Sequence, residues 1–295
     1  MIKEVKMSIV KKAFTHMGLD PGEMFRALSK WSITRALGEN GRGALIKRLR
    51  EIVPDISEQE RNEKETKTVA GEIRKRSLQA FQCSLMVKSL QGAKAGALTV
   101  VDIGDSAGTH MSYLKELMKD RFDINTISVN LNPEDVEKVR RKGLEAILCR
   151  AEELDLGDKK VDLFTSFQMV EHLHNPASFF RRLAKKSRGN KMVITVPYLK
   201  TSRVGLHHVR IGTEKEITAG DEHIFELSPN DWRLLMLHAG WRVVHDEVYY
   251  QYPRKWPLIS SLMGACWRAV DYEGFWGAIL EKDTTVSDRY IDWEE

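Results

Sequence analysis

Residues 98–114 read Leu98-Thr-Val-Val-Asp-Ile-Gly-Asp-Ser-Ala-Gly-Thr-His-Met-Ser-Tyr-Leu114, and this stretch decides the fold. A β-branched apolar run ends at Asp102, a glycine-bearing turn follows, and a helical spacing of apolar residues begins after Gly108. This order predicts a strand, a tight turn and a helix N-terminus, whose backbone N–H groups can face a ligand. We expect Gly104 to make the sharp turn and Gly108 to let the helix approach the strand end closely. Such turns occur in many α/β proteins, so the function they serve depends on the residues after the later strands.

Strand and helix patterns alternate after this turn. The expected strands are 98–103, 124–130, 146–150, 161–167, 191–196, 242–250 and 275–281. The expected helices are 109–119, 133–143, 176–187, 232–239 and a short apolar helix at 257–270. The alternation predicts an α/β fold, with seven expected strands in a mostly parallel sheet and crossover helices flanking it.

The N-terminal third shows helical spacing and no strand pattern. We therefore expect two domains, an N-terminal helical cap at 1–95 and the sheet domain at 96–295. Within the second domain we expect a long loop beside the active site at 198–227. An aromatic-rich insertion is expected at 251–274.

Composition restricts the class of protein. The 295 residues are 42% hydrophobic and 30% charged, which is typical of a globular protein rather than a disordered or fibrous one. The three cysteines lie far apart, which fits a reducing compartment and offers neither a disulfide framework nor a zinc spacing. No apolar run approaches the roughly 20 residues that cross a bilayer, and the alternating charges of 1–9 do not resemble a signal peptide. We expect a cytoplasmic protein without a transmembrane segment.

The net charge of +4 is unevenly distributed. Residues 1–95 contain 19 Lys and Arg against 11 Asp and Glu. Such a basic third could meet phosphates or an anionic membrane surface. Its acids and bases are interspersed rather than blocked, which favours ordinary solvated helix faces.

Further polar features follow each later strand in order. Asn130 ends the second strand, Ala151-Glu152 follow the third, and Glu171-His172 follow the fourth. Over about residues 98–250 this order resembles the class I S-adenosylmethionine-dependent methyltransferases, in the broad branch with a Glu-His pair after strand four. The resemblance implies a Rossmann-like, seven-stranded, mostly parallel sheet whose last strand is antiparallel. It also implies S-adenosylmethionine as cofactor and methyl transfer as the reaction.

The resemblance also implies the cofactor site. The turn after the first strand matches the family's turn against which the methionine and ribose parts of the cofactor lie. Asn130 matches the residue that bonds the ribose hydroxyls, and Ala151 with Glu152 matches the site for the adenine edge. The expected cofactor residues are Asp102, Gly104, Asp105, Ser106, Gly108, Asn130, Ala151, Glu152, Ser166 and Gln168. Ser106 replaces the family's middle glycine and Asn130 its usual acid. Ser106 is tolerable if its dihedral angles are ordinary, and Asn130 binds a hydroxyl without the gain of an ionised acceptor.

A hydroxyl acceptor benefits from a base that titrates near neutrality, and His172 with its neighbour Glu171 is the first candidate. The alternative is that this pair only fixes the following helix and bonds the backbone. His207, His208 and His223 in the long loop are other candidate bases. Some quinone-pathway relatives hold a divalent metal with Glu, Glu and His here, but this chain has Gln168 at the first position, so we expect no metal.

The acceptor is less well defined by the sequence. Aromatic residues beside Arg254-Lys255 and Arg268 could bind a sugar face or lie at a membrane interface near a lipid-linked acceptor, although packing explains most of them. The stretches 195–198, 221–227 and 251–254 also look like methyltransferases of bacterial surface-polysaccharide genes. We expect O-methylation of a hydroxyl on a glycan or small molecule.

Two other functions stay open. The first is a non-catalytic interaction protein on a methyltransferase fold, which Ser106 and Asn130 would permit. The second is a nucleic-acid methyltransferase that docks through the basic cap. Against the latter, the Asn/Asp-Pro-Pro-aromatic run of base methyltransferases is missing after strand four, and no RNA-binding module is recognisable. The sequence leaves the oligomeric state open.

Overall fold

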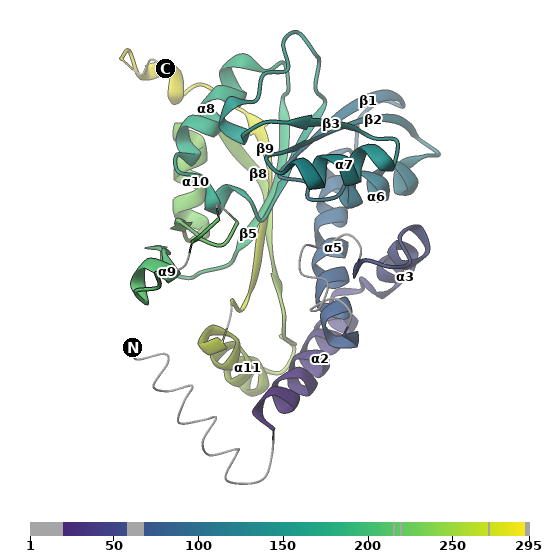
Figure 1. Cartoon of the computed structure of the whole chain (residues 1–295), viewed down its shortest axis with the longest axis vertical. Coiled ribbons are helices and arrows are strands. Elements are labelled where there is room, and N and C mark those ends of the chain that lie inside the picture. The colour runs from purple at the N-terminus through teal and green to yellow at the C-terminus, as the bar shows by residue number, and fades with distance from the viewer. Residues whose placement is uncertain (1–19, 58–67, 215, 219, 271, 293–295) are drawn as a thin grey trace. The chain divides into compact units, whose positions relative to one another are not determined.

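The computed structural model describes residues 20–57, 68–214, 216–218, 220–270 and 272–292 (Figure 1). The chain divides into two compact units. The larger unit contains most of the sheet and consists of Gln82–Arg210, Glu214–Val248 and Trp276–Glu295. The smaller unit is mainly helical and consists of Met1–Phe81, Ile211–Thr213 and Tyr249–Phe275.

Seven strands form one sheet in the order β3-β2-β1-β4-β5-β9-β8. They are β1 (Gly96–Ile103), β2 (Phe122–Asn130), β3 (Glu145–Leu148), β4 (Leu163–Phe167), β5 (Lys191–Pro197), β8 (Trp241–Tyr250) and β9 (Gly274–Lys282). The pairs β1–β2, β1–β4, β2–β3 and β4–β5 are parallel. β9 is antiparallel to both neighbours, because at its end Asp283 N donates to Gly240 O before β8 and Lys282 N donates to Asn190 O before β5. The predicted α/β sheet is confirmed, including its antiparallel last strand.

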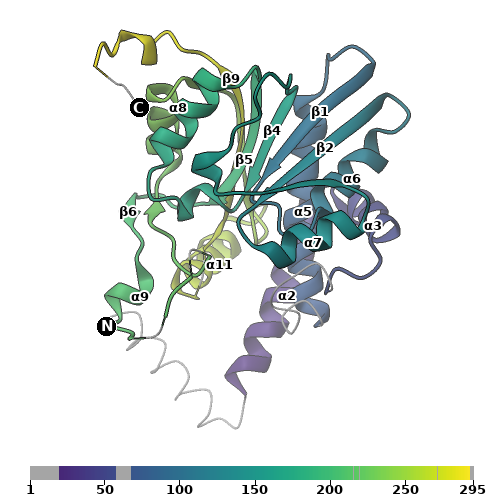
Figure 2. The same cartoon turned by 45° about the horizontal axis from the view of Figure 1, so that its top comes forward.

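Four helices of the larger unit flank the sheet: α6 (Thr109–Met118), α7 (Pro133–Arg141), α8 (Pro176–Lys186) and α10 (Pro229–His238). α6 and α7 connect strands in one direction across the sheet, from β1 toward β3, whereas α8 connects β4 to β5 in the other. Because such crossovers are right-handed, α6 and α7 cover one face and α8 the other (Figure 2). The strand order therefore reverses between β1 and β4, where open α/β sheets bind their ligands.

Three of these helices begin in the same way. The side chains of Asn132, Asn175 and Ser228 each accept a hydrogen bond from a backbone N–H two or three residues later. A proline follows each cap at the first helical turn. Proline lacks an N–H there at no cost, since that N–H would have no partner within the helix. These local signals are why the helix starts could be predicted closely.

The core of the larger unit contains three fully buried tryptophans, Trp232, Trp241 and Trp276. Nε1 of Trp241 donates to the backbone O of Phe180 at 2.8 Å, and Nε1 of Trp276 donates to Asp246 at 2.8 Å. Each of these two indoles therefore buries a large apolar area without losing its hydrogen bond.

The smaller unit contains α2 (Pro21–Asn40), α3 (Gly43–Ile52), α11 (Pro257–Val270) and the part of α5 (Val69–Ser89) up to Phe81. Arg76 of α5 is fully buried and donates to the carbonyls of Val53 and Pro54 just after α3, at 2.9 and 2.7 Å. Residues 1–19 and 58–67 of the predicted helical cap lie outside the described residues. None of the described helices is both long and apolar enough to cross a bilayer.

The segment expected as a long loop at 198–227 is partly ordered. β6 (Arg203–Val204) and β7 (Phe225–Glu226) pair in antiparallel fashion, and α9 (His207–Arg210) lies between them in sequence. A Cβ at Gly205 would lie 2.0 Å from the carbonyl O of His223, so glycine allows the two segments to approach. Two-residue strands are too short to show alternation in a sequence, so these short elements within the loop were not predicted.

Several element boundaries also differ from the predicted ones, by up to three residues. α2 continues through Gly38 to Asn40. A helical glycine costs about 1 kcal/mol, which the buried contacts of Ile33 and Ala36 can offset. β3 ends at Leu148 rather than Arg150.

Gly104 has a φ of +88°, and a Cβ there would lie 2.6 Å from Cγ of Met169. We expect Gly104→Ala to lower the free energy of unfolding by about 2–4 kcal/mol, because backbone strain adds to steric overlap. Gly143→Ala is the matched control, since Gly143 has a φ of +72° and no described atom lies within 4 Å of the place that an added methyl group would take. Strain alone should cost the control about 1 kcal/mol in urea denaturation. Equal losses would contradict a steric role for Gly104.

Candidate active site

The predicted cofactor residues lie at the carboxyl ends of the parallel strands. The glycine turn follows β1, Asn130 ends β2, Ala151 and Glu152 follow β3, and Ser166 with Gln168 stands at the end of β4. β1 is hydrogen-bonded to both β2 and β4, so the sheet gathers residues from four strands at one edge. This edge is also where the strand order reverses.

Asp105 holds the turn in shape. Its Oδ1 accepts from the backbone N of Gly108 at 2.9 Å, and its Oδ2 accepts from the hydroxyl of Ser128 in β2 at 2.7 Å. The backbone N of Gly104 donates to Val129 O at 2.8 Å, which joins the turn to the same strand. The Asp105 carboxylate is therefore a structural part of the turn, with both oxygens bonded to the protein.

The glycines of the turn have the conformations that glycine permits. Gly104 and Gly108 both have positive φ, +88° and +72°. Gly108 was expected to allow close approach to the strand end, but a Cβ there would instead meet Leu144 and Val139, at 3.0 and 3.5 Å. Ser106 is not one of the two described non-glycine residues with positive φ, so its side chain adds no backbone strain.

Asn130, expected to bind the ribose, uses both ends of its amide within the protein. Its Nδ2 donates to the backbone O of Asp105 at 2.8 Å, and its Oδ1 accepts from Asn132 N at 3.0 Å. Asn130 therefore braces the turn from β2. One N–H and one lone pair of the amide remain for a ligand.

Asp102 and Asp105 are both buried next to each other. Burial and the neighbouring charge of Asp105 raise the pKa of Asp102 well above its usual range, while a hydrogen bond from Thr165 opposes the shift. Burial also raises the pKa of Asp105, against the hydrogen bonds from Ser128 and Gly108. Oδ2 of Asp102 is buried without a hydrogen-bond partner among the described residues.

The remaining predicted cofactor residues differ in exposure. Ala151 and Glu152 form a short 3-10 helix, η2 (Ala151–Glu153), and the Glu152 carboxylate lies 3.9 Å from Nε of Arg150. Ser166 is fully buried in β4, and its hydroxyl has no hydrogen-bond partner among the described residues.

Gln168 belongs to a network that the sequence did not reveal. It has a φ of +54°, an unusual value for a non-glycine residue that is often found at functional sites. Its side-chain Nε2 donates to the hydroxyl of Thr195 at 3.1 Å, and that hydroxyl also accepts from Nε2 of Gln82 at 3.0 Å. Oε1 of Gln82 lies 2.8 Å from Nε2 of His110. A polar residue on the apolar stripe of the last N-terminal helix was the available signal for Gln82.

Glu171 is almost completely buried after β4, in η3 (Val170–His172). Neither carboxylate oxygen accepts a hydrogen bond from another described residue. Burial raises the pKa of Glu171 from 4.5 to about 7, with the nearby His223 opposing the shift and Glu226 adding to it. A carboxyl group in this state exchanges its proton near neutral pH.

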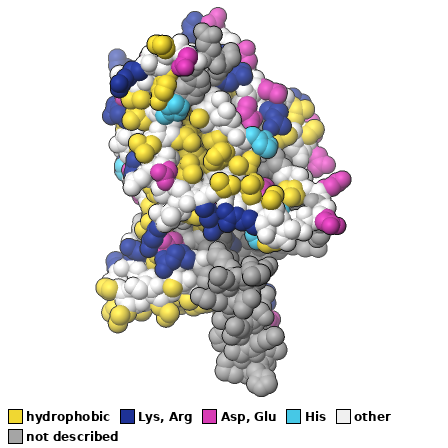
Figure 3. All heavy atoms as spheres, turned by 90° about the vertical axis from the view of Figure 1, so that its left-hand side faces the viewer, with side chains coloured by type: hydrophobic (Ala, Val, Ile, Leu, Met, Phe, Trp, Pro, Cys, Tyr) yellow, Lys and Arg dark blue, Asp and Glu magenta, His cyan; other side chains and the backbone are white. Residues whose placement is uncertain are grey.

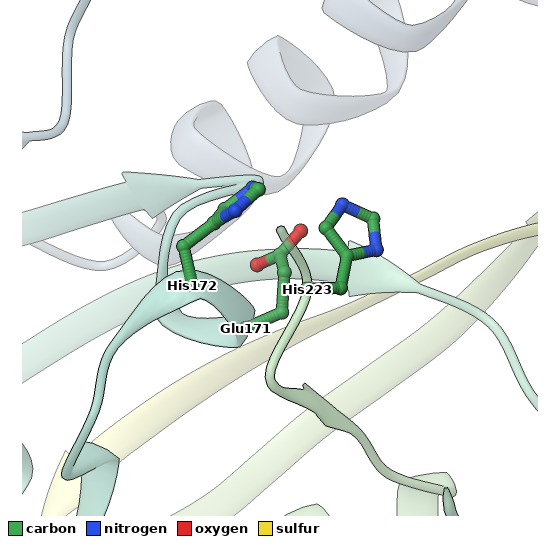
Figure 4. Close-up of side chains that lie close together, drawn as sticks. All are labelled: Glu171, His172 and His223. Atoms are coloured by element: carbon green, nitrogen blue, oxygen red, sulfur yellow. The ribbon is translucent and has the colours of Figure 1, made fainter. Parts of the chain in front are cut away.

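His172 and His223 lie on either side of Glu171 (Figure 4). The two imidazole rings meet edge to face, with centroids 4.6 Å apart. Nδ1 of His172 lies 2.9 Å from the backbone O of Glu222. Because a carbonyl only accepts, Nδ1 carries a hydrogen, and a neutral His172 has its lone pair on Nε2. The expected backbone bond of His172 is present, and it leaves the second ring nitrogen available.

The loop histidines take different positions. His223 joins Glu171 and His172, and its Nδ1 lies 3.4 Å from Glu226. His208 instead lies beside the carboxylate of Glu222, at 3.2 Å from Nδ1, and His207 is exposed in α9. Of the three, the structure brings only His223 to the Glu171–His172 pair, an association that chain order could not predict.

Glu171, His172 and His223 each offer one metal-ligating atom, and these atoms lie within 4.8 Å of one another. Carboxylate and imidazole together suit Zn²⁺ and similar ions. Gln168, by contrast, directs its amide to Thr195. The absence of a metal stays a prediction.

A family model described as a methyltransferase domain matches residues 101–194. No curated protein matches the chain. Among solved structures, a chain of the complex between the Haloferax volcanii Trm112 methyltransferase activator and a proposed methyltransferase aligns with a TM-score of 0.50 and 14% identity, covering 71% of this chain and 94% of that one. A proposed sarcosine dimethylglycine methyltransferase from Galdieria sulphuraria aligns with a TM-score of 0.50 and 15% identity, covering 72% and 88%.

The chain therefore contains a methyltransferase domain with the class I fold, and the cofactor of that class is S-adenosylmethionine. The matched residues run from the end of β1 to β5 and include the glycine turn and the Glu171–His172 pair. The resemblance seen in the sequence is confirmed at this level.

The raised pKa of Glu171 predicts a pH-dependent stability. Because its folded pKa of about 7 exceeds the ordinary 4.5, the folded state binds this proton more tightly, and stability falls as pH rises between these values. Glu171→Gln removes this ionisation. The free energy of unfolding of the variant minus that of the natural protein should therefore rise by about 2–3 kcal/mol from pH 5 to pH 8. Urea denaturation of both proteins at both pH values measures this gain. A difference that does not change with pH would contradict the raised pKa.

Proposed function

We propose that this chain transfers a methyl group from S-adenosylmethionine to a hydroxyl of a glycan or other small molecule. The observation that carries the proposal is the hydrogen bond from Nδ1 of His172 to Glu222 O. This bond selects the tautomer whose Nε2 can accept a proton. A base fixed in this way, directly after β4, is what deprotonation of a hydroxyl acceptor needs.

The turn after β1 is the proposed cofactor site. Its fit rests on the left-handed glycines Gly104 and Gly108, the N-terminus of α6, and the buried Oδ2 of Asp102 that lacks a partner among the described residues. Asn130, Ala151 and Glu152 are proposed to contact the ribose and adenine, and Ser166 with Gln168 to line the transfer site. Gln82 joins them as a positioning residue through Thr195.

When bound, S-adenosylmethionine supplies a methyl group on a positively charged sulfur, an electrophile that needs no metal. Nε2 of His172 would take the hydroxyl proton as the new O–C bond forms and the S–C bond breaks. The S–C electron pair stays on sulfur, so the products are a methyl ether, neutral S-adenosylhomocysteine and an imidazolium at His172. Much of the rate enhancement comes from holding the hydroxyl in line with the methyl and from excluding water.

Glu171 is the proposed partner of that imidazolium. A cation beside a carboxyl group lowers its pKa, so protonation of His172 favours the ionised form of Glu171. Once Glu171 has released its own proton, which His223 beside it can receive, the imidazolium and the carboxylate together have a net charge near zero. This role uses the side chain that burial leaves poised near neutrality.

A non-catalytic interaction protein is the second candidate. The observation that favours it is the engagement of Asn130 within the turn, since both ends of its amide already have protein partners. Such a protein would keep the fold without transferring methyl groups.

The test is transfer of a radiolabelled methyl group to a panel of sugars, nucleotide sugars and phenols, with transfer RNA as a separate arm. We expect label in a hydroxyl compound, as an ether that survives mild alkali. His172→Asn keeps a donor toward Glu222 O but removes the base, so it should lower kcat by about 10²- to 10⁴-fold. The KM for S-adenosylmethionine should stay unchanged.

His207→Asn is the matched control, because His207 lies exposed in α9 and takes no part in the cluster of Glu171, His172 and His223. It should keep kcat within twofold. Transfer to RNA alone, or a His172→Asn variant within tenfold of the natural protein, would contradict the proposal. Cofactor binding without any transfer would favour the non-catalytic interaction protein.

A further inference from the structure

One face of α11 is packed within the smaller unit. Met263 and Trp267 belong to a buried cluster with Ile33 of α2, and Nε1 of Trp267 donates to Oγ of Ser32 at 3.1 Å. These contacts set the rotation of the helix about its axis. The side chains on its opposite face therefore point away from the cluster.

That opposite face is apolar and exposed. Leu258 is 88% exposed, Leu262 one turn later 66%, and Ile259 beside them 40%. Trp256, just before the helix, is 60% exposed. Within 257–270, Arg268 is the only charged residue. An apolar surface of contiguous large side chains marks an interaction site rather than ordinary scatter.

Positive charge lies at the N-terminal end of this face. Arg254 and Lys255 are exposed immediately before it, and residues 254–270 contain no Asp or Glu. From α2, the Glu39 carboxylate accepts hydrogen bonds from the backbone N–H groups of Arg254 and Lys255. Arg268 pairs with Glu273 at 2.5 Å, so the remaining positive charge lies at the N-terminal end of the helix. The smaller unit as a whole contains 20 Lys and Arg against 13 Asp and Glu. In Figure 3, hydrophobic side chains line the lower left edge of the molecule, and Lys and Arg side chains lie directly above them.

The size of the face distinguishes between occupants. A stable protein–protein interface takes about 20–30 residues from each side, far more than one face of a 14-residue helix and the Trp before it. An apolar stripe with a tryptophan and lysine or arginine at its end is instead the pattern of a helix lying in a membrane interface. The cations complement the phosphates of anionic lipids.

We propose that α11 docks this protein onto the surface of an anionic lipid bilayer. Trp256, Leu258, Ile259 and Leu262 enter the boundary between headgroups and acyl chains, and Arg254 with Lys255 meets the lipid phosphates. The helix lies in the plane of the membrane, since 14 residues span about 21 Å and the hydrocarbon core is about 30 Å thick. The inference is independent of the acceptor and of methyl transfer.

The test is co-sedimentation of the purified full chain with vesicles of phosphatidylcholine, alone or with one quarter phosphatidylglycerol. We expect at least tenfold stronger partitioning onto the anionic vesicles, weakened by high salt. The double variant Leu258→Glu/Leu262→Glu should lose at least tenfold of this binding. Lys255→Glu should lose about fivefold or more on anionic vesicles only.

Leu234→Glu is the matched control, because Leu234 is 65% exposed on α10 of the other unit. It should bind vesicles like the natural protein, and circular dichroism checks that each variant is folded. Three results would overturn the proposal. The first is that the protein binds neither kind of vesicle, and the second is that the double variant binds as strongly as the natural protein. The third is that the protein does not bind vesicles but forms a concentration-dependent dimer in sedimentation velocity, which the double variant abolishes.

Discussion

The hydrogen bonds of Asp105 are the constraint on which the candidate site depends. One carboxylate oxygen accepts from Gly108 in the turn and the other from Ser128 in the neighbouring strand. Asn130 completes the arrangement by donating to the backbone O of Asp105. The turn after β1 and the end of β2 are thereby fixed to each other, and the N-terminus of α6 opens toward the edge of the sheet. Without these hydrogen bonds, Gly104 and Gly108 could adopt many backbone conformations, because glycine has no side chain to restrict them.

The second part of the site depends on burial rather than bracing. Glu171 lies in a protein interior that supplies no hydrogen bond from another described residue to its carboxylate, and its pKa rises to about 7 as a result. Burying a carboxyl group without partners costs stability, which proteins accept mainly where function uses the group. His172 and His223 lie beside it, and we propose that their imidazole rings exchange a proton with the carboxyl group. The turn after β1 is thus fixed by the hydrogen bonds of Asp105 and Asn130, whereas the Glu171 carboxyl group is buried without a hydrogen bond from another described residue.

Much of the fold could be predicted because its signals are local. Apolar runs mark the buried parallel strands, and the Asn-Pro and Ser-Pro pairs mark the helix starts. The predicted cofactor residues do share one edge of the sheet, since the ends of parallel strands must meet there. The short strands β6 and β7 within the expected loop were missed, because two-residue strands have no periodicity.

The gaps in the predicted site have one cause, which is contact between segments far apart in sequence. His223 reaches Glu171 through β6 and β7, and Gln82 reaches Thr195 from the N-terminal helices. The hydrogen bond from Asn130 to the backbone O of Asp105 is another such contact. Asn130 does end the second strand as expected, but its amide also braces the turn. Spacing along a chain identifies which residues carry chemistry. It does not show which of their hydrogen-bonding groups already bind other residues of the protein.

Calorimetric titration of the folded protein with S-adenosylmethionine and with S-adenosylhomocysteine tests whether the braced turn binds the cofactor, because both molecules share the parts that the turn is proposed to hold. We expect both to bind with micromolar dissociation constants, despite Ser106 and the hydrogen bonds that Asn130 makes within the protein. If neither binds to protein that circular dichroism shows to be folded, the turn is not a cofactor site in this chain and the enzyme proposal is contradicted.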